Sequence, residues 1–444
     1  MKSILWFRRD LRISDNAMLS QAKGEVLPIF IFDTTILNSL SKEDKRVSFI
    51  YHSVSAFQKK LQGIGLDLVV FYGKPEEIFK ALKDEGFGEV WCSVDYDAYA
   101  LARDKEVEKI LHVRRVCDAF MVEPSTHLKA DKNPYKVFTP FYKSLSFLWQ
   151  SLRLEVLPHN DSLTLSSYKK TSIPRLEEMG FEKQVLPSFL YKDGKELLED
   201  FKVKLPFYEQ RRDFFALETT SNLSVHLRFG LLSPREIFNA LREEKKSEFF
   251  IRELFWREFY TYILYHFPHS ERKNFNGYKV AWNQSREDFE KWCEGKTGFP
   301  LIDAAMKHLN ETGMMPNRLR MVVASFLTKN LLIDWRKGEA YFASKLLDYE
   351  ASSNIGSWQW AASTGADSVP YFRIFNPCTQ SLKFDKEALF IKSLLPQLRD
   401  VEPKWIHKEG GLDFVKGYVK PMVFLNASRQ RALEAYKRAK HARD

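Results

Sequence analysis

The sequence predicts an α/β N-terminal domain with a parallel, Rossmann-like sheet, followed by an all-α domain. Three observations support this prediction. The chain has 444 residues, which is too long for one ordinary hydrophobic core. Up to about residue 111, short apolar runs alternate with helical patterns, as in parallel sheets that carry helices on both faces. From about residue 201 onward, helical spacing dominates and strand-like runs are scarce.

The N-terminal elements follow from apolar runs and the residues that interrupt them. Val26–Phe32 is almost entirely apolar, as expected for a central strand that is buried on both faces. Pro75–Glu85 is predicted to be a helix, because Pro75 stands in its first turn and acidic residues follow near its positive end. The other predicted strands are Ser3–Phe7, Leu66–Tyr72 and Glu89–Ser93, and the other predicted helices are Arg46–Leu61 and Ala98–Leu111. Ligands of such sheets bind beyond the C-terminal ends of the strands, but no GxGxxG motif supports a standard dinucleotide site.

A connector is predicted between the two domains. Periodicity weakens between about Asp131 and Gly194, where polar and proline-containing pieces dominate. A structureless loop of this length inside a compact domain would be unusual. We therefore expect residues 131–197 to be partly ordered against both domains, with one helix at Tyr135–Trp149. The predicted domains are residues 1–130 and residues 198–444.

Composition indicates a globular protein and limits its expected partners and cellular compartment. Hydrophobic residues make up 44% and charged residues 28%, which argues against disorder. The formal charge of +10 permits a nucleic-acid partner without requiring one. Four cysteines form no CxxC pair and no metal-like spacing, so we expect no metal site and a reducing, cytoplasmic compartment. No signal peptide or membrane span is expected.

Two helix starts in the second half contain polar residues that suit more than one role. Ser233–Glu236 reads as a capping box with proline at the first helical position. Thr219–Ser221 precedes a predicted helix at Asn222–Phe229. Hydroxyls in that place either cap the helix or, together with backbone N–H groups, bind a phosphate.

The run FFIRELFWREFYTY predicts a helix at Phe249–Tyr262. Four of its residues fall at i, i+3, i+4 and i+7, on one helical face; they are Glu253, Trp256, Arg257 and Tyr260. One interpretation is an Arg–Glu pair beside a packed tryptophan. The other is a nucleic-acid surface, in which the indole stacks on a base and the guanidinium holds a phosphate.

The stretch Pro316–Pro377 is unusually rich in aromatic and charged side chains. Its tryptophans are Trp335, Trp358 and Trp360, and its charged residues include Arg318, Arg320, Arg336, Asp348 and Glu350. Such a mixture occurs in the buried core of a helical domain, and it also suits a site for a flat ligand with phosphates.

This stretch resembles the flavin-binding core of the photolyase/cryptochrome family. The similarity is nearly continuous over NRLRMVVASFLTKNLLIDWRKGEAYF and NIGSWQWAASTGADSVPYFRIFNP. It extends over most of the chain through LWFRRDLRISDN, TTSNLSVHLRFGLLSPRE and ELFWREF, and is closest to the class I members that act on cyclobutane pyrimidine dimers. The resemblance implies an antenna-binding α/β domain, an all-helical FAD- and DNA-binding domain, and a carbon–carbon lyase activity in DNA repair. The mechanism implied by the resemblance is that light drives the transfer of an electron from reduced FAD to a pyrimidine dimer flipped out of the duplex.

The resemblance also implies which residues bind the flavin. These are Tyr208, Thr220, Ser221, Asn222, Leu223, Ser224, Arg320, Asp348, Tyr349, Glu350 and Asn354. Arg320 and Asp348 match an ion pair beside the isoalloxazine, and Asn354 matches the residue that faces flavin N5. Trp282, Trp335 and Trp358 match a relay that carries electrons from the protein surface to the flavin.

Substrate contacts are implied in the same way. The residues expected to bind DNA are Arg212, Glu253, Trp256, Arg257, Tyr260, Asn317, Arg318, Trp360 and Gln380. The residues expected at the reaction centre are Glu253, Asn317, Met321 and Asn354. Asn317 and Met321 match members that act on cyclobutane dimers, whereas members acting on six-four photoproducts carry His there.

The antenna and the biological role have several possible answers. Ser93–Asp104 lies where folate-type members bind their pigment, but Tyr99 and Ala100 replace the expected Asn and Glu. A folate, deazaflavin or flavin antenna, or none, therefore stays open. The alternative functions are a cryptochrome-like blue-light photoreceptor, a six-four photolyase and a single-strand nucleic-acid binder. The expected partner is ultraviolet-damaged DNA, and the expected state is a monomer.

Overall fold

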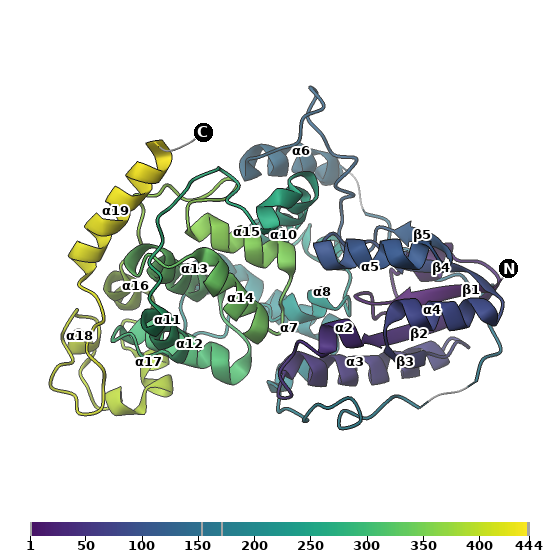
Figure 1. The fold of residues 1–444 in the computed structure, drawn as a ribbon, viewed down its shortest axis with the longest axis horizontal. Coiled ribbons are helices and arrows are strands. Elements are labelled where there is room, and N and C mark those ends of the chain that lie inside the picture. The colour runs from purple at the N-terminus through teal and green to yellow at the C-terminus, as the bar shows by residue number, and fades with distance from the viewer. Residues whose placement is uncertain (1, 152–153, 170–171, 442–444) are drawn as a thin grey trace. The chain divides into compact units, whose positions relative to one another are not determined.

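A computed structural model describes residues 2–151, 154–169 and 172–441, so part of the predicted connector lies outside the described residues. The chain folds into two compact units (Figure 1). The sheet unit comprises residues 1–134, 142–203 and 221–261, and the helical unit comprises residues 135–141, 204–220 and 262–444.

The sheet unit contains a parallel sheet in the strand order β3-β2-β1-β4-β5. Its strands are β1 (Lys2–Phe7), β2 (Glu25–Asp33), β3 (Val69–Gly73), β4 (Phe87–Ser93) and β5 (His112–Val116). Leu27 of β2 pairs with Ile4 of β1, which pairs in turn with Val90 of β4. A short strand from the predicted connector, β6 (Thr164–Leu165), also pairs with β2. The predicted Rossmann-like sheet is confirmed.

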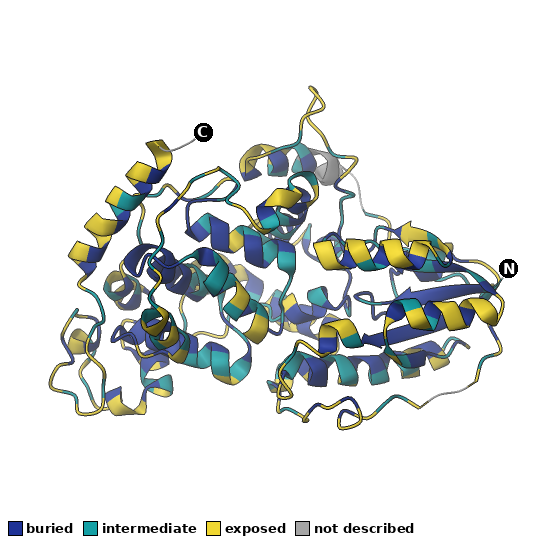
Figure 2. Ribbon diagram, in the orientation of Figure 1, coloured by how far each residue is buried: buried dark blue, intermediate teal, exposed yellow. Residues whose placement is uncertain are grey.

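Helices cover both faces of this sheet. On one face, α1 (Ala17–Gln21) and α3 (Lys45–Gln62) pack on the side chains of β1 and β2. On the other face, α4 (Pro75–Asp84) and α5 (Ala98–Glu108) pack on the alternate side chains of the same strands. Figure 2 shows the central strands as buried. Burial on both faces explains why Val26–Phe32 is continuously apolar.

Three short elements of the sheet unit do not follow from the sequence pattern. The strand β5 reads HVRRV, and its exposed His112, Arg114 and Arg115 interrupt the apolar pattern of a strand. The other two are the short helices α1 and α2 (Thr34–Leu37), which are held by the Asn16 and Asp33 side chains at their N-caps. Local capping, rather than periodicity, defines them.

The described part of the helical unit is built from helices around one large hydrophobic cluster. Its main helices are α11 (Arg286–Glu294), α12 (Pro300–Thr312), α13 (Asn317–Ser325), α14 (Trp335–Lys345), α15 (Ala351–Ala361), α16 (Pro377–Phe384), α17 (Leu389–Leu394), α18 (Pro403–Ile406) and α19 (Leu425–His441). A π-helical turn, Phe326–Asn330, extends α13. The predicted all-α character is confirmed. Among the described helices, none has the length and apolar character needed to cross a membrane.

The remaining helices are α6 (Phe138–Ser151), α7 (Gly194–Arg211), α8 (Ser224–Arg228), α9 (Pro234–Leu241) and α10 (Glu248–His266). The helices predicted within Tyr135–Trp149 and Phe249–Tyr262 are therefore present as α6 and α10. Ser233 caps α9 as predicted, by accepting a hydrogen bond from the Arg235 N–H (3.1 Å). The prediction for α8 was too long, because Asn222 adopts a left-handed backbone (φ 56°) and Leu223 is the N-cap without a side-chain bond.

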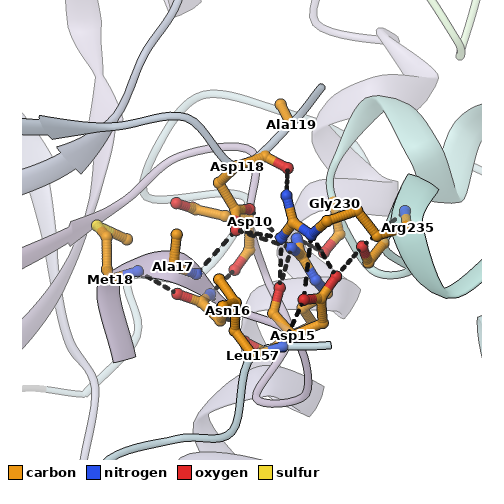
Figure 3. A network of polar contacts seen from close by, with 12 residues as sticks. Asp10, Asp15, Asn16, Ala17, Met18, Asp118, Ala119, Leu157, Gly230 and Arg235 are labelled. Carbon is orange, nitrogen blue, oxygen red and sulfur yellow. Dashed lines mark hydrogen bonds and ion pairs between the residues drawn. The ribbon is translucent and has the colours of Figure 1, made fainter. Parts of the chain in front are cut away.

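A buried charged network explains why residues 221–261 group with the sheet, and not with the C-terminal part predicted to start at residue 198 (Figure 3). Arg235 of α9 donates through Nε to Asp15 Oδ2 (2.9 Å) and through Nη2 to Asp118 Oδ1 (3.3 Å). Arg12 pairs with the same Asp118 (2.8 Å). Gly230 lies so close to the β1–α1 loop that a Cβ atom would stand 2.0 Å from the carbonyl oxygen of Arg9.

Candidate flavin and substrate site

The segment Thr219–Ser224, which leads into α8 and includes its first residue, contains five of the predicted flavin-binding residues. Asn222 adopts its left-handed conformation at the centre of the segment, and the Leu223 N–H donates to Ser221 Oγ (3.3 Å). Thr219 Oγ1 is buried without a hydrogen-bond partner among the described residues. A buried hydroxyl in that state costs free energy unless a ligand satisfies it. The segment therefore fits the polar part of a dinucleotide cofactor.

Tyr208 and Arg212 lie together at the end of α7. Tyr208 is 7% exposed, and the Arg212 guanidinium lies 5.5 Å from its ring centroid and 3.5 Å from its hydroxyl oxygen. The predicted flavin contact and the predicted DNA contact are thus neighbours. A guanidinium stacked on a phenol has already lost part of its conformational entropy, so less entropy is lost when it binds an anion.

The four predicted DNA-contacting residues of α10 share one face, as their spacing required. Glu253, Trp256, Arg257 and Tyr260 are all half-buried, whereas the residues between them are buried. The rings of Trp256 and Tyr260 lie 5.5 Å apart at an interplanar angle of 35°. This face presents two adjacent aromatic rings, as base-stacking surfaces do.

Arg257 differs from the other three residues because it has a firm structural role. Its Nη1 donates to the backbone oxygen of Ala119 (2.7 Å), and its guanidinium lies 4.3 Å from the Phe120 ring centroid. Next to it, Glu258 accepts hydrogen bonds from the N–H groups of Met121 and Val122. Burial raises the pKa of Glu258 to about 7, although Arg257 and these N–H groups oppose the shift.

The predicted substrate-determining pair lies on the outer side of α13. Asn317 is exposed and Met321 is half-buried, four residues apart, whereas Leu319 and Val322 face the core. The neighbouring Arg318 donates to Asp213 Oδ2 (2.6 Å) and stacks on Phe384. Asn317 and Met321 are thus accessible on one surface, as a substrate contact requires.

The predicted ion pair between Arg320 and Asp348 is present. Arg320 Nη2 lies 3.0 and 2.8 Å from the two carboxylate oxygens of Asp348, and Arg320 Nε donates to the backbone oxygen of Met315 (2.7 Å). The Asp348 side chain is 7% exposed. Because three hydrogen bonds fix the guanidinium, it offers a cation in a set position.

Of the three predicted relay tryptophans, Trp282 is more exposed than the other two. Trp282 is half-buried, whereas Trp335 and Trp358 are 1% and 2% exposed. Trp335 and Trp358 belong to the large hydrophobic cluster, and Trp282 packs against it. Trp335 Nε1 donates to Asn274 Oδ1 (2.8 Å). The burial pattern agrees with a relay that starts at the surface, but the relay itself stays a prediction.

Close packing between α14 and α15 fixes Trp358. A Cβ atom on Gly338 of α14 would stand 2.2 Å from Cη2 of the Trp358 ring. The ring also lies 5.0 Å from Phe342 and 6.0 Å from Trp292, measured between centroids. Glycine is therefore required where the indole meets the helix backbone.

Asn354 lies on α15, one turn before Trp358, and is 8% exposed. Its Nδ2 donates to the backbone oxygen (3.1 Å) and to Oε1 (2.9 Å) of Glu339 on α14. Two further predicted flavin contacts, Tyr349 and Glu350, are half-buried directly before α15. Three of the residues predicted to bind the flavin thus lie on α15 or directly before it.

Trp360 and Gln380 are both half-buried in the helical unit. Trp360 packs against the large hydrophobic cluster, while Gln380 belongs to α16. The amide oxygen of Gln380 is buried without a hydrogen-bond partner among the described residues. This unsatisfied acceptor fits a role in ligand or DNA binding.

The C-terminal edge of the sheet, where an antenna would bind, contains interacting side chains of the chain itself. The Tyr99 hydroxyl donates to Asp33 at the end of β2. The guanidinium groups of Arg8 and Arg103 lie 4.6 and 4.8 Å from the Trp6 ring centroid. The hydrogen bond to Asp33 accommodates the Tyr99 side chain at this edge.

Sequence reasoning missed three residues of the helical unit. Glu339 binds Asn354, Gly338 admits Trp358, and Trp292 packs edge-on against Trp358 while donating to the Val323 carbonyl oxygen (3.2 Å). A glycine within a helical pattern was the one available signal, since such a residue often marks close packing. Among the described residues, no group of three or more His, Cys, Asp or Glu side chains is arranged to hold a metal ion.

Comparisons with known proteins agree with this combination of a Rossmann-like sheet and a helical domain with flavin-type contacts. The family model described as DNA photolyase matches residues 3–157, and the model described as the FAD binding domain of DNA photolyase matches residues 250–438. A deoxyribodipyrimidine photo-lyase from Alkalihalophilus pseudofirmus is 37% identical, over 91% of this chain and 89% of the relative.

Two solved structures share the fold over nearly the whole chain. The archaeal photolyase from Sulfolobus tokodaii, solved with two FAD molecules, is 33% identical with a TM-score of 0.87, covering 99% of this chain and 100% of that one. A cryptochrome from Synechocystis is 25% identical with a TM-score of 0.87, covering 98% and 99% of the two chains. The fold and sites define a flavin-dependent, light-driven class of protein. The chain belongs to the DNA photolyase family, whose FAD-binding domain it carries.

Proposed function

We propose that the protein repairs cyclobutane pyrimidine dimers in ultraviolet-damaged DNA, using light and a bound reduced FAD. The observation that carries this proposal is helix α15, which places three side chains of the required chemistry on one element. Asn354 and Trp358 are buried, and Trp360 is half-buried. In this proposal, one helix would supply flavin orientation, an electron donor and a ring that stacks on a base.

The residues present fit FAD. The buried hydroxyl of Thr219 has no partner among the described residues, and Arg320 is held in place by Asp348. Tyr208, Thr220–Ser224, Tyr349 and Glu350 would bind the cofactor, and Asn354 would face its ring. When bound, the flavin supplies light absorption and one-electron chemistry.

The side chains of the protein itself would position the damaged DNA and exclude water from the site. Trp256 and Trp360 would stack on the flipped-out bases, and Glu253 and Asn317 would accept or donate hydrogen bonds at their edges. Met321 would supply an apolar contact to the dimer. Arg212, Arg318 and Gln380 would hold the DNA backbone, mainly through charge. Trp282, Trp335 and Trp358 would pass electrons inward to restore the reduced cofactor.

The test is illumination of the purified, reduced protein with ultraviolet-damaged oligo(dT), following the recovery of thymine absorbance. We expect recovery that requires light. A matched variant, Glu253→Ala, should retain FAD and lose most of the repair yield, because it removes a base contact and leaves the flavin contacts intact. No recovery from protein that holds reduced FAD would contradict the proposal. It would favour a photoreceptor or, if a six-four lesion is repaired instead, a six-four photolyase.

We further propose a monomeric, cytoplasmic protein that carries a flavin- or deazaflavin-type antenna. The cysteines Cys92, Cys117, Cys293 and Cys378 are all free thiols, in agreement with a reducing compartment. Tyr99 at the sheet edge argues against folate, and the relative from Sulfolobus tokodaii was solved with two FAD molecules. Chromatography of the pigments released by denaturation tests the antenna. A released folate would overturn the proposal.

A further inference from the structure

Glu339 is a half-buried carboxylate that the family resemblance did not assign, and it contacts the residue predicted to face flavin N5. It lies one helical turn after Trp335 on α14. Asn354 Nδ2 lies 2.9 Å from its Oε1 and 3.1 Å from its backbone oxygen. Both contacts join two helices of the same unit that pack closely through Gly338.

These two contacts determine which way the Asn354 amide points. A carboxylate and a backbone carbonyl can only accept hydrogen bonds, and only the NH2 group of an asparagine can donate them. Both N–H bonds of Asn354 are therefore directed to Glu339. Its carbonyl oxygen, Oδ1, is the amide atom that this contact leaves available for a ligand.

The surroundings of Glu339 make the contact strong. Burial raises the pKa of Glu339, the hydrogen bond from Asn354 lowers it, the nearby Glu271 carboxylate raises it, and a hydrogen bond from Tyr349 lowers it. Hydrogen bonds to a poorly solvated carboxylate are worth more than neutral ones. Turning the amide by 180° would place two acceptors against its oxygen, so that orientation is excluded.

We propose that Glu339 is a positioning residue for the flavin: it fixes the Asn354 amide so that a hydrogen-bond acceptor, and not a donor, faces N5. This inference rests on the proposed function, which places Asn354 beside the flavin. A reduced flavin carries a hydrogen on N5, whereas an oxidised flavin offers a lone pair there. An acceptor at this place stabilises the reduced cofactor, which is the form that repair requires.

The experiment measures the midpoint potential of FAD in the purified holoprotein and the rate at which air oxidises the reduced flavin. In Glu339→Ala the side-chain acceptor is lost and only the backbone oxygen at position 339 still binds Asn354 Nδ2, so the amide orientation is held less firmly. We therefore expect a more negative potential and air oxidation several-fold faster than in the unaltered protein. Glu339→Gln keeps an acceptor for Nδ2 and should restore both values. In an Asn354→Ala background, Glu339→Ala should cause no further shift.

Thermal unfolding provides the control, because a merely structural role would change stability and leave the potential alone. An unchanged potential in Glu339→Ala, or shifts from Glu339→Ala and Asn354→Ala that simply add, would overturn the inference. If Glu339→Ala loses FAD, Glu339→Asp shortens the side chain and withdraws the acceptor, and the same comparison applies to it. Dimer repair by chemically reduced protein separates this outcome from a failure of the proposed function, since repair should persist in Glu339→Gln.

Discussion

The charged network of the sheet unit and the α14–α15 contacts of the helical unit are both shielded from water, but they are built from different chemistry. The network joins the cations Arg12 and Arg235 to the anions Asp15 and Asp118, and all four side chains are largely buried. Around α14 and α15, the neutral donors of Trp335 and Asn354 bind the Asn274 amide oxygen and the Glu339 carboxylate. Breaking a buried ion pair leaves a charge without its partner, which is costly. Neutral donors among aromatic rings leave a region of low dielectric constant, which suits the transfer of an electron.

This comparison predicts its largest effect at Trp358. Trp358→Phe keeps an aromatic ring in the cluster but removes the easily oxidised indole. We expect photoreduction of the oxidised flavin to be abolished, while repair by chemically reduced protein is retained. Absorbance during illumination and the dimer-repair assay measure the two activities. Equal loss of both would mean that Trp358 serves packing alone.

The next effect concerns the charged network. Asp15→Ala leaves Arg235 buried without its main partner, and such losses cost about 3–5 kcal/mol. Urea unfolding measures the change in the free energy of unfolding. The matched control is Lys192→Ala, which removes exposed pairs with Glu196 and Asp200 and should be silent. Equal stability of the two variants would contradict the distinction between buried and exposed pairs.

A pH titration sharpens the comparison through Glu258, which is 3% exposed. Its folded pKa of about 7 lies above its ordinary value of 4.5, so the folded state binds the proton more tightly. The contribution of Glu258 to the free energy of unfolding is therefore fully present below pH 4.5, and it is lost as the pH rises from 4.5 to about 7. The difference between the two pKa values corresponds to roughly 3 kcal/mol of stability that is lost over this pH range.

Glu258→Gln removes this titration but can still accept the Met121 and Val122 N–H groups. We expect the free energy of unfolding to fall less steeply between pH 4.5 and 7 in the variant, with a gain near neutral pH. Urea unfolding at several pH values measures it. Parallel pH profiles for the two proteins would show that Glu258 titrates normally.

The smallest effect is expected at Gly338. Gly338→Ala forces a methyl group against the Trp358 ring, and overpacking of this kind costs about 1–3 kcal/mol. The fluorescence of the tryptophans and the unfolding midpoint should both change. Gly73→Ala is the control, because its Cβ would meet Ile78 Cδ1 at an ordinary 3.5 Å. A silent Gly338→Ala would mean that α14 and α15 separate easily.

The sequence was sufficient where apolar pattern and local chemistry act together. The continuous apolar run of β2, the first turn of α4 and the cap at Ser233 all follow from short-range rules. The strand β5 escaped because its side chains at a sheet edge are polar. For α8, the left-handed Asn222 shortened the helix, and a left-handed residue has no reliable signature other than glycine.

The site residues likewise divide into those that could be predicted from the sequence and those that depend on packing between helices. The Arg320–Asp348 pair could be predicted because the resemblance covers both residues, and the structure confirms it. The role of Glu339 could not, because it depends on how α14 packs against α15, and its partner lies fifteen positions along the chain. Contacts between helices depend on packing that periodicity does not encode.

The discontinuity of the sheet unit has a consequence for the order in which the chain folds. The last residues of that unit, up to Thr261, emerge from the ribosome long after the strands. Until Arg235 arrives, Asp15 lacks its cation, and Asp118 is paired with Arg12 alone. Contacts across more than two hundred residues raise contact order and slow folding. The sheet unit, though not the strands of its sheet, should therefore stay incomplete and exposed to chaperones until more than half of the protein has been synthesised.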